Sequence, residues 1–449
     1  MLIELDRDAP LDQAPGRRPP PRLYRPAGLL LAATLLVTLA GAAPFASTFW
    51  RDLGTIAAAG DAETPIQLAG GRIYTAGTAG RDREVTAWSL DRPMRRLWAT
   101  RVPIGMSYNP VSGLFGSFTI RQAGDVVLLS EGFATTALDG RTGQVRWRSP
   151  VAVTLLGTGG IGVAVERVFR PGTVYDQASG DPGPLYFSAS GEPHTEPPVR
   201  TEVRGLDIAT GRVVWTSAPG GSVTVDPVHG DGPAVLITSS DRLTLHAAGT
   251  GEVLAEAALP KLNGSGPVTA TVAGDVALVG YRAPGQEVAY DVRTLRRLWA
   301  WKLPDFEGDT PDCRDVICSG PRDDLWVLDP ATGRRAWQAN GDVDLTVRAG
   351  MVLETKVRTG RPDRLADPLT GRNRVILTGW DEVLPGEPNG TVVVRRDTDS
   401  GQTFGAVLPG RAELRVLGTV DVDSGECSAD EHHLVCRDGT GLRVWAYRI

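Results

Sequence analysis

The sequence contains very little lysine and no excess of positive charge. Only three of its 47 basic residues are lysines (Lys261, Lys302 and Lys356), a bias typical of a GC-rich genome, and 53 acidic residues give a net charge of -6. Proteins that bind nucleic acid through bulk charge present a basic face, so that class is excluded and no nucleic-acid partner is expected. Hydrophobic residues make up 41% of the chain, enough for a large core, which excludes global disorder.

Common catalytic and metal-binding motifs are also missing. The chain has no G-x-S-x-G, H-E-x-x-H, P-loop or EF-hand sequence. Residues 157–162 read G-x-G-x-x-G, but a dinucleotide site needs a helix directly after this motif, and residues 163–169 alternate in polarity as a strand does. We therefore predict a hairpin turn there. We also predict that the protein is not an enzyme, with no catalytic, cofactor-binding or metal residue assigned and no cofactor expected.

One uncharged apolar run stands near the N-terminus. The segment Ala27–Phe45 would form a helix of about 28 Å, long enough to span a hydrocarbon core. The run is preceded by Arg17, Arg18, Arg22 and Arg25, so the positive-inside rule places the N-terminus in the cytoplasm. We predict a single-pass protein of the cell membrane, with a disordered cytoplasmic tail over 1–26, a transmembrane helix over 27–48 and an extracytoplasmic domain over 49–449. A signal peptide cleaved near residues 40–42 is the alternative.

Four cysteines form two close pairs in the sequence. Cys313 and Cys318 are five residues apart, and Cys427 and Cys436 are nine apart. An even number of cysteines outside the cytoplasm favours disulfides, so each pair is predicted to be bridged at the start of a hairpin. The alternative is a metal site made by Cys427, Cys436 and the two histidines between them, His432 and His433, but their spacing matches no standard zinc pattern.

A short unit recurs along the chain: an apolar strand, an aspartate, a turn with Thr-Gly, and a strand that contains tryptophan. An aspartate carboxylate can accept backbone N–H groups two or three residues on, glycine supplies a positive φ, and tryptophan is large enough to fill the gap between one sheet and the next. A further copy, from Asp291 to Trp299, lacks the glycine. The full copies contain Asp139, Gly143 and Trp147, then Asp207, Gly211 and Trp215, then Asp329, Gly333 and Trp337.

These units resemble the tryptophan-docking motif of the pyrroloquinoline-quinone-type β-propeller repeats. The resemblance implies an all-β fold, a β-propeller of four-stranded blades, and the period near 40 residues is typical of such blades. The last unit ends after its third strand, so a segment near residues 48–53 or just after it is expected to supply the fourth and remove an exposed sheet edge. We predict eight blades, with seven as the alternative, because motif aspartates or their equivalents fall near residues 90, 139, 207, 247, 291, 329, 367 and 397.

The resemblance extends both to quinoprotein dehydrogenases and to non-catalytic propellers of bacterial envelopes. For the enzymes it implies adjacent bonded cysteines, a Ca²⁺ held by Glu and Asn, and a catalytic Asp. This chain has no Cys-Cys pair, and no catalytic residue carries over. We predict a membrane-anchored scaffold that binds an envelope protein without catalysis. The alternatives are a pyrroloquinoline quinone-dependent dehydrogenase and a propeller that binds cell-wall glycan or a small ligand.

The predicted binding element is an insertion rich in Gly and Pro over residues 170–200. It contains Tyr175, Tyr186 and Phe187, and loops of this kind often carry function. The alternative is a surface excursion without a function. Trp88 and Trp380 lie outside the docking position, which makes them further candidates for binding, and Trp380 is expected to be less costly to replace.

Overall fold

The computed structural model describes residues 50–448, apart from positions 58–65, 81, 104–117, 132–133, 158–159, 177, 179, 181–184, 190, 221–223, 229–231, 282–284, 303–312, 315, 387–388, 423–425 and 440. The predicted tail over 1–26 and the predicted transmembrane helix over 27–48 lie outside the described residues. Among the residues that are described, no helix has the length and apolar character needed to cross a membrane. Residues Arg322–Asp324 form a 3₁₀ turn.

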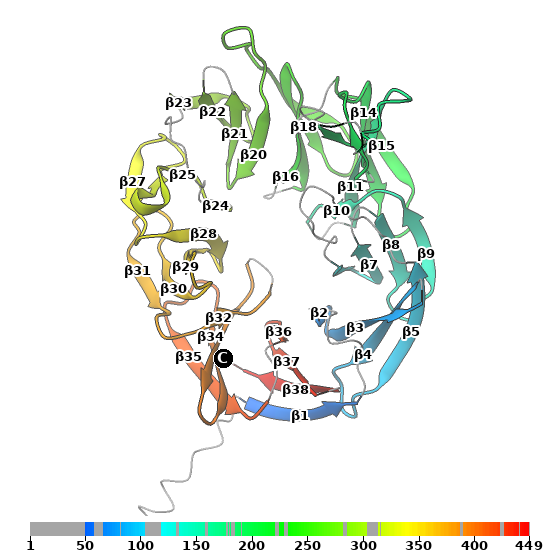
Figure 1. Ribbon diagram of the computed structural model, residues 1–449, viewed down its shortest axis with the longest axis vertical. Coiled ribbons are helices and arrows are strands. Elements are labelled where there is room, and N and C mark those ends of the chain that lie inside the picture. Colours follow the sequence, from blue (N-terminus) through cyan, green and yellow to red (C-terminus); the bar gives the residue numbers. More distant parts are fainter. Residues whose placement is uncertain are drawn as a thin grey trace, which may run out of the picture. The chain divides into compact units, whose positions relative to one another are not determined.

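Antiparallel sheets that follow one another around a ring make up the compact unit Phe49–Ile449 (Figure 1). We call each sheet a blade and label its strands A to D from the inside of the ring outward. Blade 1 contains β2 (Gln67–Ala69), β3 (Arg72–Ala79), β4 (Asp82–Ser89) and β5 (Arg96–Pro103), and blade 2 contains β6 (Thr119–Ala123), β7 (Val126–Glu131), β8 (Ala134–Asp139) and β9 (Val145–Ser149). Blade 3 contains β10 (Val153–Leu155), β11 (Ile161–Val168), β14 (Arg200–Asp207) and β15 (Val213–Ser217), and blade 4 contains β16 (Thr224–Val228), β17 (Ala234–Thr238), β18 (Arg242–Ala247) and β19 (Val253–Ala258).

The remaining blades continue in the same order. Blade 6 has three strands, and blade 9 takes its outer strand from the start of the chain. Blade 5 contains β20 (Thr269–Ala273), β21 (Val276–Tyr281), β22 (Gln286–Asp291) and β23 (Arg297–Lys302), and blade 6 contains β25 (Cys318–Ser319), β26 (Trp326–Leu328) and β27 (Arg335–Gln338). Blade 7 contains β28 (Val343–Arg348), β29 (Met351–Lys356), β30 (Pro362–Ala366) and β31 (Asn373–Ile376), and blade 8 contains β32 (Glu382–Val383), β33 (Val392–Thr398), β34 (Gly401–Val407) and β35 (Leu414–Val420). Blade 9 contains β36 (Cys427–Ala429), β37 (His433–Asp438), β38 (Gly441–Tyr447) and β1 (Trp50–Ile56).

The described chain therefore has nine blades, and both eight and seven were wrong. The count of aspartates failed at the last two blades. Asp397 lies near the turn between β33 and β34, which joins strands B and C of blade 8. The C–D turn of that blade, around Pro409 and Gly410, has no aspartate. Blade 9 has no C–D turn at all, because its C and D strands come from opposite ends of the chain.

The two ends of the described chain close the ring. Strand β1 pairs antiparallel with β38, from Trp50 opposite Tyr447 to Ile56 opposite Leu442. This confirms the expectation that the segment after the apolar run completes the last blade. The outer edge of β38 is thereby covered, which removes an edge that could pair with another chain.

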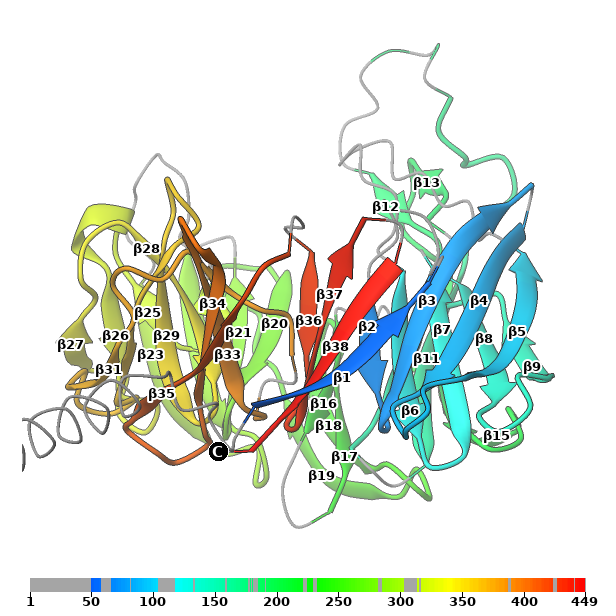
Figure 2. The same cartoon turned by 90° about the horizontal axis from the view of Figure 1, so that it is seen from below.

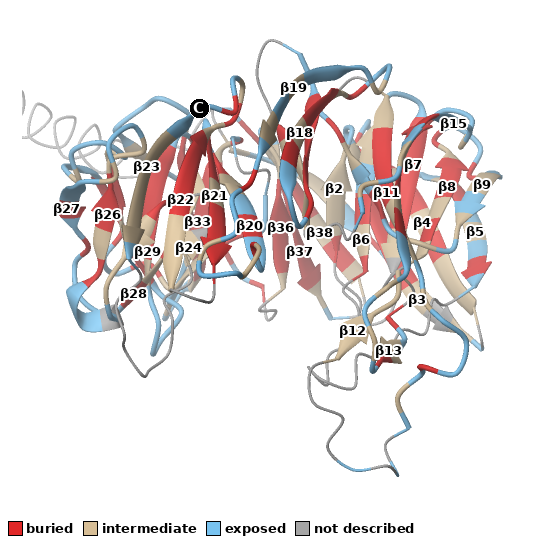
Figure 3. Ribbon diagram, turned by 90° about the horizontal axis from the view of Figure 1, so that it is seen from above, coloured by how far each residue is buried: buried red, intermediate tan, exposed pale blue. Residues whose placement is uncertain are grey.

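Hydrophobic packing joins each blade to the next. Nine clusters of buried side chains occur in the described residues, and each combines residues of two consecutive blades, including blade 9 with blade 1. Burial is greatest in the middle strands: every residue of β17 is buried, whereas the outer strand β19 alternates between exposed and half-buried positions (Figure 3). A blade therefore buries its two faces against its neighbours, as stacked repeats must.

Candidate functional site

The aspartates of the repeat hold the turns between strands C and D. Asp139 Oδ1 accepts hydrogen bonds from the Thr142 backbone N–H at 2.8 Å and from the Thr142 hydroxyl at 2.9 Å. Asp207 makes the same two contacts with Thr210, at 2.8 and 2.7 Å. The Arg146 guanidinium, followed by the Thr142 groups, holds the pKa of Asp139 well below its usual value. These carboxylates are therefore committed to turn structure.

The repeat tryptophans dock onto the turn of the following blade. Trp147 Nε1 donates to the Ile208 carbonyl at 2.8 Å, and the indole covers Gly211, whose φ is +70°. The other four follow the same pattern, from Trp98 to Gly140 O, Trp215 to Ala248 O, Trp299 to Pro330 O and Trp337 to Pro368 O. Trp98, Trp215 and Trp337 are buried and Trp147 and Trp299 are half-buried, so these indoles pack between blades and hold neighbouring blades together.

Trp380 is buried although it lies outside the docking position. Its exposed fraction is 6%. The indole packs in the cluster between blades 7 and 8 and covers Gly405, where an added Cβ would lie 2.7 Å from the ring. The interpretation of Trp380 as a binding residue was therefore wrong, because its side chain is buried in the gap between blades 7 and 8.

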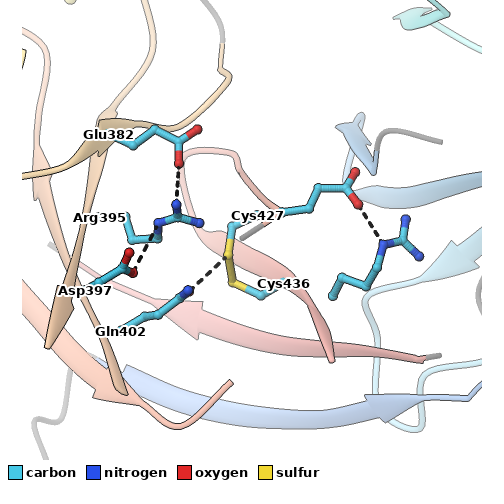
Figure 4. The surroundings of a disulfide bond; sticks show 8 residues. Glu382, Arg395, Asp397, Gln402, Cys427 and Cys436 are labelled. Atoms are coloured by element: carbon cyan, nitrogen blue, oxygen red, sulfur yellow. Dashed lines mark hydrogen bonds and ion pairs between the residues drawn. A yellow bond between two sulfur atoms is a disulfide. The ribbon is translucent and has the colours of Figure 1, made fainter. Parts of the chain in front are cut away.

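Both predicted disulfides are present. Cys427 and Cys436 lie directly opposite each other in β36 and β37, so this bridge does join the first hairpin of its blade. It is buried between blades 8 and 9, with the Gln402 amide 3.8 Å from Cys427 Sγ, and nearby Arg395 pairs with Glu382 (Figure 4). Since both sulfurs are bonded, they do not form the alternative metal site with the neighbouring histidines.

The second disulfide departs from the expected hairpin. Cys313 lies in β24 (Cys313–Arg314), which pairs in parallel with strand A of blade 7, opposite Leu345. Cys318 begins β25 in blade 6, opposite Val327. The bridge between Cys313 and Cys318 therefore connects strands of two different sheets. The expectation of a stapled hairpin was wrong here, because the strand before Cys318 pairs with the next blade.

A cavity of about 520 Å³ lies at the inner edge of the ring, beside the A–B turns of blades 8, 9 and 1. Its polar side is formed by the turn that contains Asp430, His432 and His433. Asp430 accepts both backbone N–H groups of these histidines at 2.7 Å and faces the His433 imidazole. Burial would raise the pKa of Asp430, but these hydrogen bonds outweigh it and hold the pKa below its usual value.

The acidic group of that turn is already hydrogen-bonded within the turn. The Asp430 carboxylate is occupied by its own turn, and no group of three or more His, Cys, Asp or Glu that could hold a metal occurs among the described residues. The G-x-G-x-x-G segment joins β10 to β11, which pair antiparallel, and its Ile161 and Gly162 already belong to β11, so a strand and not a helix follows its turn, as predicted.

The insertion leaves blade 3 between its B and C strands. Since successive strands are antiparallel, B–C turns lie on the face of the ring opposite the A–B turns, and the insertion projects from that face (Figure 2). It forms a small hairpin of β12 (Tyr186–Phe187) and β13 (Pro193–His194). Tyr175 also bonds to this hairpin, through its backbone N–H and the Pro193 carbonyl at 2.9 Å.

The structure therefore brings Tyr175, Tyr186 and Phe187 together around β13. All three side chains are half-buried, and Tyr175 donates its hydroxyl to Gly180 O at 2.8 Å. Their role in binding stays a prediction.

A histidine that sequence reasoning passed over anchors this insertion. His194 is 5% exposed, and its ring stacks on Phe169 at 3.7 Å between centroids. Its Nδ1 lies 2.9 Å from the Thr173 hydroxyl. An ion pair of 2.9 Å between Arg170 and Glu196 joins the two ends of the insertion. The insertion is therefore a built element with its own buried contacts.

The fold and the docking turns define a β-propeller with tryptophan-docked blades. A family model described as outer membrane protein assembly factor BamB matches residues 116–339. This match, which spans about half of the chain, supports a propeller of the pyrroloquinoline-quinone type. A comparison with curated protein sequences finds no match.

Solved structures of propellers also resemble the chain. BamB from Moraxella catarrhalis is 14% identical, with a TM-score of 0.37, and the match covers 73% of this chain and 96% of that one. The computationally designed protein Ika8 is 14% identical, with a TM-score of 0.41 and coverages of 89% and 100%. A europium-containing methanol dehydrogenase is 11% identical, with a TM-score of 0.39 and coverages of 88% and 93%. None of these scores reaches 0.5, and we infer nothing further from them.

Proposed function

We propose that this protein is a membrane-anchored, extracytoplasmic scaffold that binds an envelope protein through the blade 3 insertion and catalyses no reaction. One observation carries the proposal. The insertion is a folded addition to a bare four-stranded blade, and it is held in place by buried His194. The name of the matched family, an outer membrane assembly factor, supports a role in protein interaction.

The proposed location rests on two features of the chain. The uncharged run over 27–48 is long enough to span a bilayer, and arginines precede it. The two disulfides suit an oxidising compartment. A reporter that is active only outside the cytoplasm, fused after Ile449, should therefore be active, whereas a reporter that needs the cytoplasm should be silent. The reverse pattern would contradict both the anchor and the location.

The partner experiment compares the wild-type protein with two variants in cells by cross-linking, purification and mass spectrometry. In the first variant, residues 170–198 are replaced by a two-residue turn, which is feasible because β11 and β14 stay paired as far as Val168 and Arg200. The control variant is Leu369→Ser, which changes an apolar side chain that is 68% exposed at a C–D turn on the opposite face. The wild type and the control should capture the same protein, and the shortened variant should lose it. Capture that survives the shortening would contradict the proposal.

Two further functions remain to be tested against this one. A quinone-dependent dehydrogenase should bind pyrroloquinoline quinone with Ca²⁺ and oxidise alcohols or sugars, and we expect neither activity above a denatured control. A glycan-binding propeller should pull down with purified cell-wall polymer, and we expect no enrichment.

A further inference from the structure

An arginine occupies an inward position in a strand that is otherwise apolar on that face. Side chains in a strand alternate between its two faces, so Val163, Val165 and Arg167 of β11 share one face. Val163 belongs to the hydrophobic cluster between blades 3 and 4. Arg167 therefore points toward the gap between these two blades, near the face that carries the insertion.

This gap holds a cavity of about 280 Å³. Three structural units line it. Blade 3 contributes Arg167 and its apolar neighbours on β11, blade 4 contributes Val225 of β16, and the insertion contributes Phe187 and Ser188. The cavity is therefore small, lined by polar and apolar surface in similar amounts, and bordered by the insertion that we propose for partner binding.

Within the part of the chain that the structure describes, the Arg167 guanidinium has no counter-charge. Among the described residues it forms no hydrogen bond or ion pair, and the one influence on its pKa is burial, which lowers that pKa. Its neighbours differ: Arg170 pairs with Glu196 at 2.9 Å, and Arg204 donates to Glu202 at 2.6 Å. A half-buried charge without a partner is unfavourable unless something binds it.

A second polar group on the same face also lacks a partner. Thr201 lies directly opposite Arg167 in the β11–β14 ladder. Its side chain is 1% exposed, and its Oγ1 accepts and donates no hydrogen bond within the described structure. Opposite residues in antiparallel strands have Cβ atoms about 4.5–5.5 Å apart, so the hydroxyl stands beside the guanidinium stem.

We propose that this cavity is a binding site for a carboxylate carried on a short apolar body. A guanidinium binds a carboxylate through two parallel hydrogen bonds, and Ser188 and Thr154 supply hydroxyls in the cavity wall. The valines accept the apolar body. The carboxylate belongs either to a free small acid or to the C-terminus of a peptide, since both present the same chemistry. The proposal does not depend on the partner-binding role of the insertion.

The test is a calorimetric titration of the full-length protein with matched probes. The free-acid probe is 3-methylbutanoate and the peptide probe is acetyl-Gly-Val, and each is paired with its uncharged amide. The variant is Arg167→Gln, and the control is Arg204→Gln, which changes an arginine of the neighbouring strand β14 that already has partners and does not line the cavity. A charged hydrogen-bonded pair typically accounts for a roughly 10- to 100-fold change in Kd, so Arg167→Gln should weaken carboxylate binding by that factor and Arg204→Gln should leave it unchanged.

Melting curves separate a binding role from a structural one. Because Arg167 has no partner, Arg167→Gln should unfold at the wild-type temperature or above it. Binding of both carboxylates indicates a small-molecule site, and binding of the peptide alone indicates a chain terminus; either result supports the proposal. It is overturned if neither carboxylate binds at about 10 mM, a concentration that would detect even weak complexes, if the amides bind equally well, or if Arg167→Gln binds like the wild type.

Discussion

Leu295 fills the space that a tryptophan of the preceding blade would fill, and the residue at that tryptophan position is Ala255. Leu295 stands at the glycine position of its docking turn, where its φ is +54° and its backbone N–H still bonds to the Asp291 carbonyl at 2.8 Å. Its side chain is 3% exposed and packs in the cluster that includes Ala255. In the gap between blades 4 and 5, the space at the docking turn is therefore filled by a side chain of blade 5 instead of a side chain of blade 4.

This exchange predicts strong coupling between the two positions. Leu295→Gly alone should destabilise the protein by about 1–3 kcal/mol, because lost packing outweighs the relieved positive φ. Ala255→Trp alone should cost about 1–3 kcal/mol, because the indole meets the leucine. The double variant should recover part of both losses, with a coupling energy of about 0.5–3 kcal/mol by denaturant unfolding. Additive losses would contradict the docking geometry.

Trp337 and Trp380 should be equally sensitive to replacement. Both are 6% exposed and pack between blades, so alanine at either position should cost about 3–5 kcal/mol. Trp326 is the control, since it is half-buried and its Nε1 bonds only to Asp324 at the surface. Chemical denaturation measures all three. A Trp337→Ala curve that matches the wild type would refute the packing role of the docking tryptophans.

The repeated turn was readable from sequence because each of its parts has a local cause. Asp139, Thr142 and Gly143 satisfy one another within five residues, so the pattern needs no knowledge of the rest of the chain. Trp380 shows where that reasoning ends. Its burial depends on Gly405, which lies in a later strand and leaves room for the ring. The residues next to Trp380 in the sequence do not predict this space for its ring.

The two disulfides should differ in their resistance to reduction. Cys427 and Cys436 are 5% and 0% exposed, whereas Cys313 and Cys318 are half-buried. In the folded protein, a mild thiol reductant should open Cys313–Cys318 first. Alkylation followed by peptide mass spectrometry at increasing times measures the order. Prior labelling of Cys427 would contradict the assigned burial.

Removal of either bridge by paired alanine substitutions should cost stability. The loops are short, so chain entropy alone gives about 2–3 kcal/mol for each bridge. The Cys427–Cys436 pair should cost more than this, because its sulfurs also pack in the cluster between blades 8 and 9. Equal melting of the variant and the wild type would show that this packing contributes nothing.

The turn of blade 7 should make stability depend on acid pH. The Arg374 guanidinium, followed by the Thr370 hydroxyl, lowers the pKa of Asp367 to about 2. A lowered folded-state pKa gives stability that is present above the unfolded pKa near 4 and is lost as the pH falls through about 2. Arg374→Gln should therefore be less stable than the wild type at pH 6, and the difference should shrink between pH 4 and pH 2. Added salt should also reduce it, because the pair is at the surface. A difference that stays constant with pH would contradict the ion pair.

Arg167 and the ninth blade show two different limits of sequence reasoning. Arg167 can be recognised in the sequence, because it is a charged residue on the otherwise apolar face of an alternating strand. Its lack of a counter-charge among the described residues could not be predicted, because it depends on the positions of blade 4 and the insertion. The blade count failed because the repeat marks only C–D turns. Blade 9 has none, since its C and D strands are joined by pairing between the two ends of the chain.

Ring closure by strand β1 is the most direct test of the architecture. Arg51 and Ala446 lie opposite each other in the β1–β38 ladder, as Cys427 and Cys436 do in the β36–β37 ladder. Both positions were chosen because neither side chain is buried. The double variant Arg51→Cys, Ala446→Cys should form a third intramolecular disulfide under mild oxidation, detected by peptide mass spectrometry, and should then unfold at a higher temperature than its reduced form. A chain that oxidises only at its native cysteines, with the two new thiols still free, would contradict the closed nine-bladed ring.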